Sequence, residues 1–184
     1  MSARSARDDG RWRIALIVLS DKAAQGLRQD ACLPALRAAL QPSRFAIVRE
    51  EVLADDRERL EQLLTALCDS DEADGILTSG GTGLSPRDIT PQATLAVADY
   101  QVPGLADAMR NRSAEHIPTA MLSRAVVAVR RRTLIVNLPG SPRAIPETLG
   151  IILPVLDHAF QLLRETVGEH ATPPTSAEPD KQMK

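Results

Sequence analysis

Residues 75–95 read GILTSGGTGLSPRDITPQATL, and this stretch decides the fold. It begins as a short apolar run, passes through a loop that holds three glycines, and ends in TPQATL. The TPQ sequence predicts a helix start, with Thr90 as the N-cap and Pro91 at the first helical position. A strand, a glycine-rich loop and a helix in direct succession are typical of one βα unit.

The alternation of strand and helix continues toward the N-terminus. Residues 13–19, RIALIVL, form a β-branched run that predicts a strand covered on both faces. Residues 44–53, RFAIVREEVL, predict a second strand. Leucines recur at helical spacing between these strands and again in a predicted helix that Asp56 opens.

The C-terminal half holds further elements of both kinds. One helix is predicted to begin after Pro103-Gly104, and the runs AVVAV (125–129) and TLIVNL (133–138) predict a hairpin. The arginines between these runs, at 130–132, are predicted to form a solvated turn. Residues 145–163 predict a long helix that Pro154 kinks or divides in two.

These elements predict one α/β domain with three αβα layers and a mostly parallel, Rossmann-like sheet. A chain of 184 residues is long enough for one well-buried domain. We expect residues 1–12 to be a flexible segment, 13–168 the domain and 169–184 a disordered tail, because the tail lacks apolar spacing and is rich in proline.

Composition excludes several classes of function. The net charge is -2 and aromatic residues make up 2% of the chain, so neither a basic field nor a base-stacking platform for nucleic acid is expected. Cys32 and Cys68 lie in apolar helical patterns and are predicted to be core thiols. The apolar runs are too short for a membrane span, and we expect a cytoplasmic protein.

In sheets of this kind, ligands bind at the carboxyl ends of the strands. Polar residues follow the predicted strands at these ends. Ser20 and Asp21 follow the first strand, Asp55 the second, the glycine loop and Asp88 the third, and residues 137–141, NLPGS, the last. We therefore expect these segments to meet at one edge of the sheet.

The glycine loop itself suggests an anion site. Gly80, Gly81 and Gly83 can adopt positive φ and let successive backbone N–H groups point into a concavity suited to phosphate. Thr78, Ser79 and Thr82 add hydroxyl donors. The alternative is a turn that only connects strand to helix, since neither common nucleotide-binding signature is present.

Two carboxylates beside that loop suggest a cation. Asp55 and Asp88 both lie just past strand ends, and a carboxylate among phosphate oxygens needs a hard cation between them, most simply Mg²⁺. Each also has a structural alternative, Asp55 as a helix N-cap and Asp88 as a cap of the turn before Thr90.

Four segments together carry a family resemblance: SDKAAQG (20–26), LTSGGTGLSPRDITPQATLAVAD (77–99), MLSRAVVAV (121–129) and NLPGSPRAIPETL (137–149). Over about residues 13–164 the chain resembles the MogA/MoaB family of molybdenum cofactor biosynthesis proteins. The resemblance implies an enzyme that binds molybdopterin and Mg·ATP, transfers AMP to the terminal phosphate of the pterin and releases pyrophosphate. It also implies a homotrimer, with a molybdenum-insertion enzyme as a partner.

By the same resemblance, Asp55 and Asp88 match the essential acidic positions, which would be catalytic and hold the metal. The residues that match ligand-binding segments are Ser20, Asp21, Thr78, Ser79, Gly80, Gly81, Thr82, Gly83, Asn137, Pro139, Gly140 and Ser141. Two alternatives stay open, namely a homologue that binds molybdopterin without catalysis and a hydrolase of nucleotide diphosphate linkages.

Overall fold

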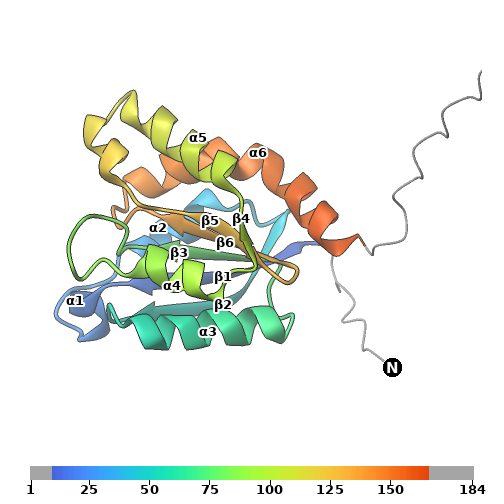
Figure 1. The fold of residues 1–184 in the computed structure, drawn as a ribbon, viewed down its shortest axis with the longest axis horizontal. Coiled ribbons are helices and arrows are strands. Elements are labelled where there is room, and N and C mark those ends of the chain that lie inside the picture. Colours follow the sequence, from blue (N-terminus) through green and yellow to red (C-terminus); the bar gives the residue numbers. More distant parts are fainter. Residues whose placement is uncertain (1–9, 166–184) are drawn as a thin grey trace, which may run out of the picture.

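A six-stranded sheet forms the middle layer of the molecule, and helices cover both of its faces (Figure 1). The computed structural model describes residues 10–165. The strand order is β2-β1-β3-β6-β5-β4. Strands β1 (Trp12–Leu19), β2 (Phe45–Leu53), β3 (Gly75–Ser79) and β6 (Thr133–Leu138) run parallel, whereas β5 (Val127–Arg130) is antiparallel to β6 and β4 (Tyr100–Gln101) is antiparallel to β5. The predicted mostly parallel sheet is confirmed.

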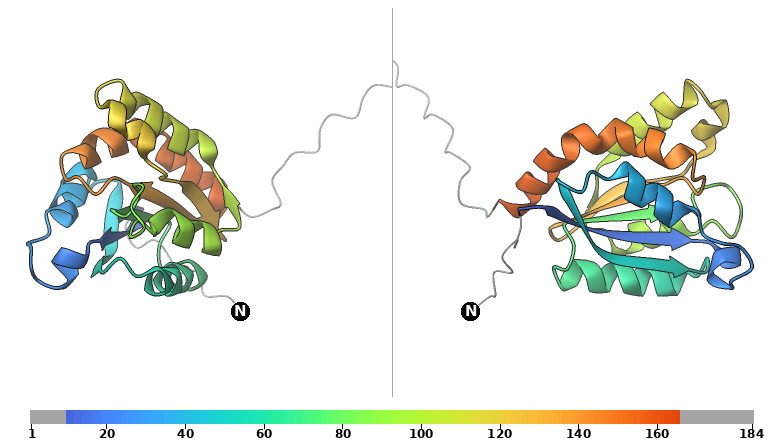
Figure 2. Two further views of the ribbon diagram at one scale, coloured as in Figure 1. Left: turned by 60° about the vertical axis from the view of Figure 1, so that its left-hand side comes forward. Right: turned by 180° about the vertical axis from the view of Figure 1, so that it is seen from behind.

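The helices divide into two layers. Helices α3 (Arg57–Asp69) and α4 (Thr90–Val97) lie below the sheet in Figure 1, whereas α5 (Pro103–Ala114) and α6 (Ala144–Arg164) lie above it. Helix α2 (Cys32–Ala39) packs against α6 on that second face, as the rotated views in Figure 2 show. Two short elements, α1 (Asp21–Ala24) and the 3₁₀ helix η1 (Pro118–Leu122), follow β1 and α5. The predicted three-layer α/β architecture is therefore confirmed.

Strand β1 shows why its sequence is a continuous apolar run. Ile14, Leu16 and Val18 belong to the core under α2, α5 and α6, whereas Ala15 and Ile17 belong to the core under α3 and α4. Successive side chains of a strand point to opposite faces, so a central strand between two helix layers must be apolar at every position.

Trp12 lies outside the domain in the sequence-based boundaries, and that assignment is wrong. Trp12 is the first residue of β1 and is 6% exposed. Its indole Nε1 donates a hydrogen bond of 2.8 Å to Asp157 Oδ1, and its ring lies 5.2 Å from the ring of Phe160. These contacts with α6 extend the domain toward the N-terminus. The rest of the predicted flexible segment up to residue 9, and the predicted tail 169–184, lie outside the described residues.

Two helix predictions need correction. Ile89, not Thr90, occupies the N-cap of α4, and Thr90 is the first helical residue, because its hydroxyl donates to the carbonyl of Gly80 instead of capping the helix. Helix α6 runs without a break from Ala144 to Arg164 with Pro154 in its interior, so Pro154 does not divide the helix in two. Its buried face, from Ile145 to Phe160, keeps the helix against the sheet despite the hydrogen bond that a proline removes.

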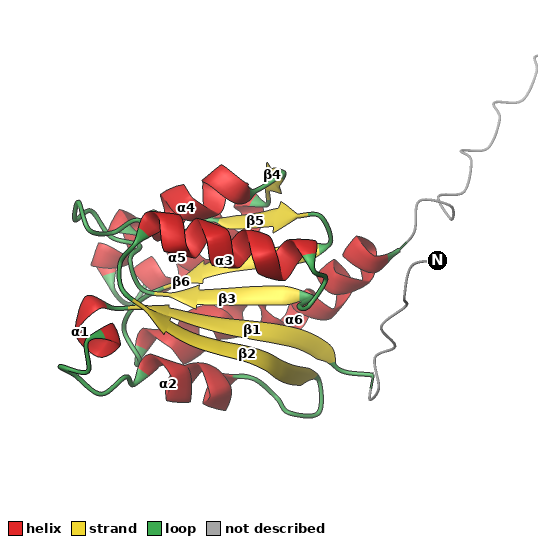
Figure 3. Cartoon of the chain, turned by 90° about the horizontal axis from the view of Figure 1, so that it is seen from below, coloured by secondary structure: helices red, strands yellow, loops and turns green. Residues whose placement is uncertain are grey.

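The predicted hairpin is confirmed, with Arg131 in its turn at φ 53°. Arg130 and Arg131 pair with Asp69, and Arg132 lies 3.6 Å from Asp71. This turn precedes β6, so it lies at the edge of the sheet opposite the glycine loop that follows β3 (Figure 3). The arginine cluster forms surface ion pairs at this turn.

Cys32 and Cys68 are both free and buried, as predicted. Burial raises the pKa of the Cys68 thiol to about 11, so it stays protonated at neutral pH. Within residues 10–165, no helix combines the length and apolarity that a membrane span requires.

Candidate active site

The loops after β1, β2, β3 and β6 meet at the carboxyl edge of the sheet, as predicted. The chain passes from β1 to β2 on one side and returns to β3 on the other side of β1, so this edge is the topological switch point of the sheet. The loops after β3 and β6 are in direct contact, because Gly80 N donates to Leu138 O and a Cβ on Gly140 would lie 3.1 Å from the Gly80 Cα. The edge is therefore one continuous site.

Gly80 and Gly81 have the positive φ that the sequence predicts, 103° and 63°. A Cβ at Gly80 would lie 2.3 Å from the carbonyl oxygen of Leu19, and one at Gly81 would lie 2.5 Å from Thr90 Oγ1. Gly83 does not have a positive φ; its hydrogen atom makes room for Asp88 Oδ2, which would lie 2.9 Å from a Cβ. The loop thus needs glycine for backbone conformation at two positions and for space at all three.

The backbone N–H groups of the glycine loop are available to a ligand. Among residues 10–165, no acceptor receives the N–H groups of Gly81, Thr82 or Gly83. Their carbonyls are occupied, because Gly81 O accepts from Thr90 N, Thr82 O from Arg124 N, and Gly83 O from Arg124 Nε. Three consecutive free N–H groups in a half-buried loop are the donor set of an anion nest.

The predicted hydroxyl donors differ in their availability. Thr78 Oγ1 donates to Val136 O and Ser79 Oγ donates to Pro139 O, so both buried hydroxyls connect β3 to the chain of β6. Thr82 Oγ1 has no partner among the described residues and faces a cavity. Thr82 is therefore the hydroxyl in this loop that a ligand can use directly.

The buried side chain of Asn137 connects three segments of the chain beneath the glycine loop. Its Nδ2 donates 2.9 Å hydrogen bonds to Thr78 Oγ1 and Thr94 Oγ1, and its Oδ1 accepts from Val126 N. These bonds tie β3, α4 and the approach to β5 together. Asn137 also lines the cavity, with its hydrogen-bonding atoms already paired inside the protein.

Asp21 and Asp55 hold the loops after β1 and β2 together. Asp55 N donates to Asp21 Oδ1 at 3.0 Å, and Asp21 N donates to Asp55 Oδ2 at 3.4 Å. Arg87 pairs with Asp21 at 2.5 Å, which brings the SPRD segment to the same place. Asp21 is thereby ion-paired, whereas Asp55 forms no salt bridge with a described residue.

The environment of Asp55 opposes its negative charge. Burial first, and then the charges of Asp21 and Asp88, raise the pKa of the Asp55 carboxyl above its usual value, although the Asp21 N–H and Arg87 act in the opposite direction. A cation at this place would relieve the repulsion between the carboxylates. The helix-cap alternative for Asp55 is wrong, because Asp56 caps α3 by accepting from Arg59 N.

Asp88 combines a structural contact with an available oxygen. Its Oδ2 accepts from Ser85 N at 2.8 Å, which closes the turn before α4, so the capping contact that the sequence allows is present. The carboxylate makes no salt bridge among residues 10–165 and lines a cavity. Capping a turn with one oxygen leaves the other free to bind a cation.

The acids fit a magnesium ion that is shared with a substrate. No cluster of three or more His, Cys, Asp or Glu side chains suited to a metal occurs among residues 10–165. Magnesium commonly binds through one or two carboxylates, substrate phosphates and water, so a complete protein cage is not required. Asp55 and Asp88 are the two carboxylates that would hold such an ion beside the nest.

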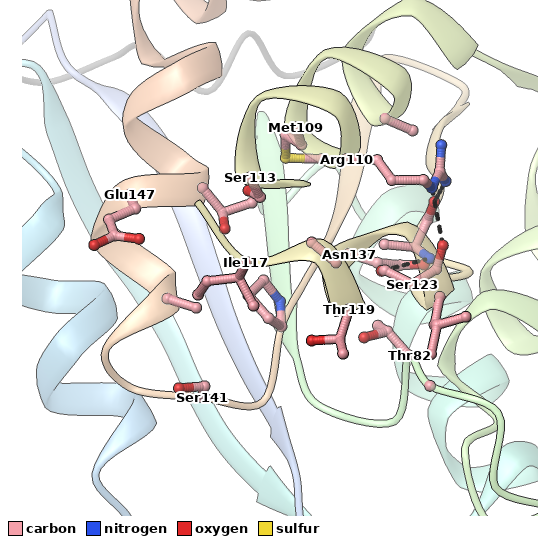
Figure 4. Close-up of a pocket in the computed structure, with 18 residues that line it drawn as sticks. Thr82, Met109, Arg110, Ser113, Ile117, Thr119, Ser123, Asn137, Ser141 and Glu147 are labelled. Carbon is pink, nitrogen blue, oxygen red and sulfur yellow. Dashed lines mark hydrogen bonds between the residues drawn. The ribbon is translucent and has the colours of Figure 1, made fainter. Parts of the chain in front are cut away.

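A largely apolar cavity of about 400 Å³ lies next to the nest, between α5, η1 and the start of α6 (Figure 4). Figure 4 shows Ser141 and Glu147 on one side of it and Thr82, Thr119 and Ser123 on the other. Predicted residues of the loops after β3 and β6, Thr82 and Ser141, therefore face this cavity from opposite sides. A volume of this size suits a small-molecule ligand.

The remaining predicted residues are distributed around this edge. Pro139 lines the cavity beside Ser141, and Gly140 contacts Gly80. Ser20 lies apart from the cavity and caps α1, where its Oγ accepts from Ala23 N and from Arg28 Nη2. Its hydroxyl thus stabilises the β1–α1 loop.

Two arginines of this site are missing from the sequence-based prediction. Arg124 donates to Gly83 O and Asp88 O, each at 2.6 Å, and so fixes the backbone at the end of the glycine loop. Arg110 of α5 donates to Ser123 O and Ala125 O and fixes the segment that carries Arg124. Neither stands in a periodic or glycine-rich pattern, and the MLSRAVVAV segment, which contributes to the family resemblance, is the one signal that points to Arg124.

Comparison with known proteins agrees with this geometry. The family model described as "Probable molybdopterin binding domain" matches residues 15–158. Molybdopterin adenylyltransferases of Haemophilus influenzae and Escherichia coli are each 44% identical over 139 residues, which cover 74% of this chain and 71% of those proteins. Solved structures of related proteins share the fold of this chain.

A crystal structure of the molybdopterin biosynthesis enzyme MoaB from Thermus thermophilus has a TM-score of 0.78 and 44% identity, covering 83% of this chain and 96% of that one. The molybdopterin biosynthesis Mog protein from Mycobacterium ulcerans has a TM-score of 0.77 and 39% identity, covering 83% and 99%. With the switch-point loops, the open nest and the family match in agreement, this chain belongs to the molybdopterin-binding domain family of molybdenum cofactor biosynthesis proteins.

Proposed function

We propose that this protein is a molybdopterin adenylyltransferase, which uses Mg·ATP to transfer AMP to the terminal phosphate of molybdopterin. The observation that carries the proposal is the row of open N–H groups at Gly81–Gly83, with Asp55 and Asp88 beside it and a ligand-sized cavity next to it. The names of the relatives from Haemophilus influenzae and Escherichia coli support the same activity.

The cavity has the surfaces that a pterin needs. Met109, Ile117 and Pro139 offer apolar walls to a flat ring system, and Ser113 and Glu147 offer polar groups to its edges. The pterin phosphate would reach the N–H groups of the glycine loop, because Thr82 and Gly83 line both the nest and the cavity.

The reaction then requires positioning and charge stabilisation. A phosphate oxygen of molybdopterin forms a bond to the α-phosphorus of ATP, the bond from that phosphorus to the bridging αβ-oxygen breaks, and pyrophosphate leaves with that oxygen. No general base is required, because a phosphate monoester is anionic at neutral pH.

Each group of residues has a part in this transfer. The nest holds the attacking phosphate by its N–H groups, while Asp21 fixes the backbone of Asp55 and Arg124 fixes that of Asp88. When bound, Mg²⁺ supplies positive charge to the triphosphate and Asp55 and Asp88 hold it there.

We further propose that the enzyme is a cytoplasmic homotrimer that passes its adenylylated product to a molybdenum-insertion enzyme. These assignments rest on the family resemblance.

The direct test combines purified protein with molybdopterin, ATP and Mg²⁺ and identifies the products by mass spectrometry. Adenylylated molybdopterin together with pyrophosphate is the expected result. Molybdopterin that binds without a new product would instead support a binding homologue. Cleavage of nucleotide diphosphate linkages without a pterin product would support a hydrolase.

A further inference from the structure

A second cavity lies on the other side of the glycine loop. Its volume is about 420 Å³, and its wall includes Leu84, Ser85, Pro86, Asp88 and Ile89 of the loop before α4 and Gln92 of α4 itself. Thr82 and Gly83 face the first cavity, so the two hollows are neighbours separated by one loop. Asp88 lines the second cavity, which places that hollow at the proposed metal site.

The cavity has an apolar part that faces solvent. The Leu84 side chain is 65% exposed, and Pro86 and Ile89 lie on the same wall. One exposed leucine is common on protein surfaces. Three apolar side chains around a hollow offer flat surfaces on which an aromatic ring can stack.

Gln92 gives the cavity an unpaired polar group. Its Oε1 is buried and has no hydrogen-bond partner, and its amide nitrogen donates to no described residue. A buried acceptor without a donor costs free energy, and an unexplained one in a cavity wall calls for a ligand or a bound water. An amide offers one acceptor and one donor side by side.

The charges around the hollow complete the site. Arg57 and Arg124 line it and add positive charge, and Asp88 lies between this hollow and the nest. A ligand with an aromatic base, a donor next to an acceptor on its edge, and a phosphate chain that reaches a metal would fit all of these features.

We propose that this second cavity receives the adenine base of the nucleotide and that Gln92 reads its edge. The amide complements the N6 amino group and N7 of adenine, as amide side chains do in DNA recognition, whereas guanine presents two acceptors, O6 and N7, at the corresponding edge. The inference rests on the proposed adenylyl transfer and adds the determinant of base choice. The triphosphate would then lie beside Asp88, at the place where the second cavity adjoins the nest.

The test measures the binding of two nucleotides that cannot transfer their nucleoside monophosphate, α,β-methylene-ATP and α,β-methylene-GTP. Calorimetry with Mg²⁺ uses the full chain. The wild type should bind the adenine analogue about 10-fold more tightly. Gln92→Leu should lose that preference by weakening adenine binding, and Gln92→Glu, which removes the amide donor, should also weaken it.

Two controls separate this effect from general damage. Gln62→Leu changes an exposed glutamine of α3 that does not line the cavity and should leave both affinities unchanged. Thermal midpoints should show that Gln92→Leu folds as well as the wild type or better, because it removes a buried acceptor without a donor.

The outcomes also separate this inference from the proposed function. The proposal that the second cavity binds adenine would be wrong if the wild type bound both analogues equally, bound neither, or kept its preference in Gln92→Leu. Each of these outcomes would count against it even if the wild type transfers AMP. A preference for the adenine analogue that depends on Gln92 would support adenine binding in the second cavity, even if the wild type transfers no AMP.

Discussion

The guanidinium of Arg124 donates from Nη2 to the main-chain carbonyl of Asp88 at 2.6 Å, while its Nε donates to Gly83 O at the same distance. One planar side chain therefore fixes the end of the glycine loop and the acid that follows it. Because both bonds go to carbonyls, the loop's N–H groups remain free for a ligand.

Arg124→Lys should lower AMP transfer by roughly 10-fold to 100-fold, because an ammonium group cannot span two carbonyls as a planar fork does. The control is Arg112→Lys on the exposed side of α5, which should leave transfer unchanged. Turnover and pterin affinity would be measured on both. If Arg124→Lys transfers AMP at the normal rate, the loop does not depend on this contact.

Gly81→Val should weaken binding of the pterin phosphate much more than it lowers the thermal midpoint. A β-branched residue resists a φ of 63°, and its Cβ would lie 2.5 Å from Thr90 Oγ1, so the nest must change shape. Gly150→Ala is the matched control, since a Cβ there meets no atom within 4 Å. Loss of binding only in proportion to unfolded protein would indicate a connecting turn without a ligand.

Asp55→Asn should raise the thermal midpoint at pH 7 and have less effect near pH 4. The pKa of the Asp55 carboxyl is raised in the folded protein, chiefly by burial, so its contribution to stability is largest below its unfolded pKa and is lost as pH rises through the folded pKa. Asparagine removes the charge that becomes unfavourable. Thermal melts across this pH range, without nucleotide, provide the measurement, and a lower midpoint for the variant at pH 7 would contradict the expectation.

A trimer is expected in solution. Light scattering at micromolar concentrations should report a mass near three times the 19.9 kDa of one chain. A mass that stays at the value for one chain over this concentration range would rule out the trimer.

The sequence is informative where local pattern and topology determine the outcome. The apolar run of β1 follows from burial on both faces, and the meeting of Asp55 with the glycine loop follows from parallel strands that end at one edge. The pairing of Ser79 with Pro139 depends on the register between β3 and β6, which no local pattern encodes. The same holds for Arg124, whose contacts with the glycine loop exist only in the folded chain.

Asp88→Asn gives the sharpest test of the metal-centred mechanism. Asparagine can keep the contact with Ser85 N through its carbonyl oxygen, so the turn before α4 should remain and the thermal midpoint should change little. It removes the negative charge that a hard cation needs. If Asp88 holds Mg²⁺ against the triphosphate, AMP transfer should fall by about two orders of magnitude or more, the scale expected on loss of a main electrostatic stabiliser.

Pterin affinity should change much less, because the cavity of Figure 4 does not include Asp88. Turnover and pterin binding measured on the same folded variant separate these roles, and near-normal adenylylation by Asp88→Asn would mean that the carboxylate serves the turn alone.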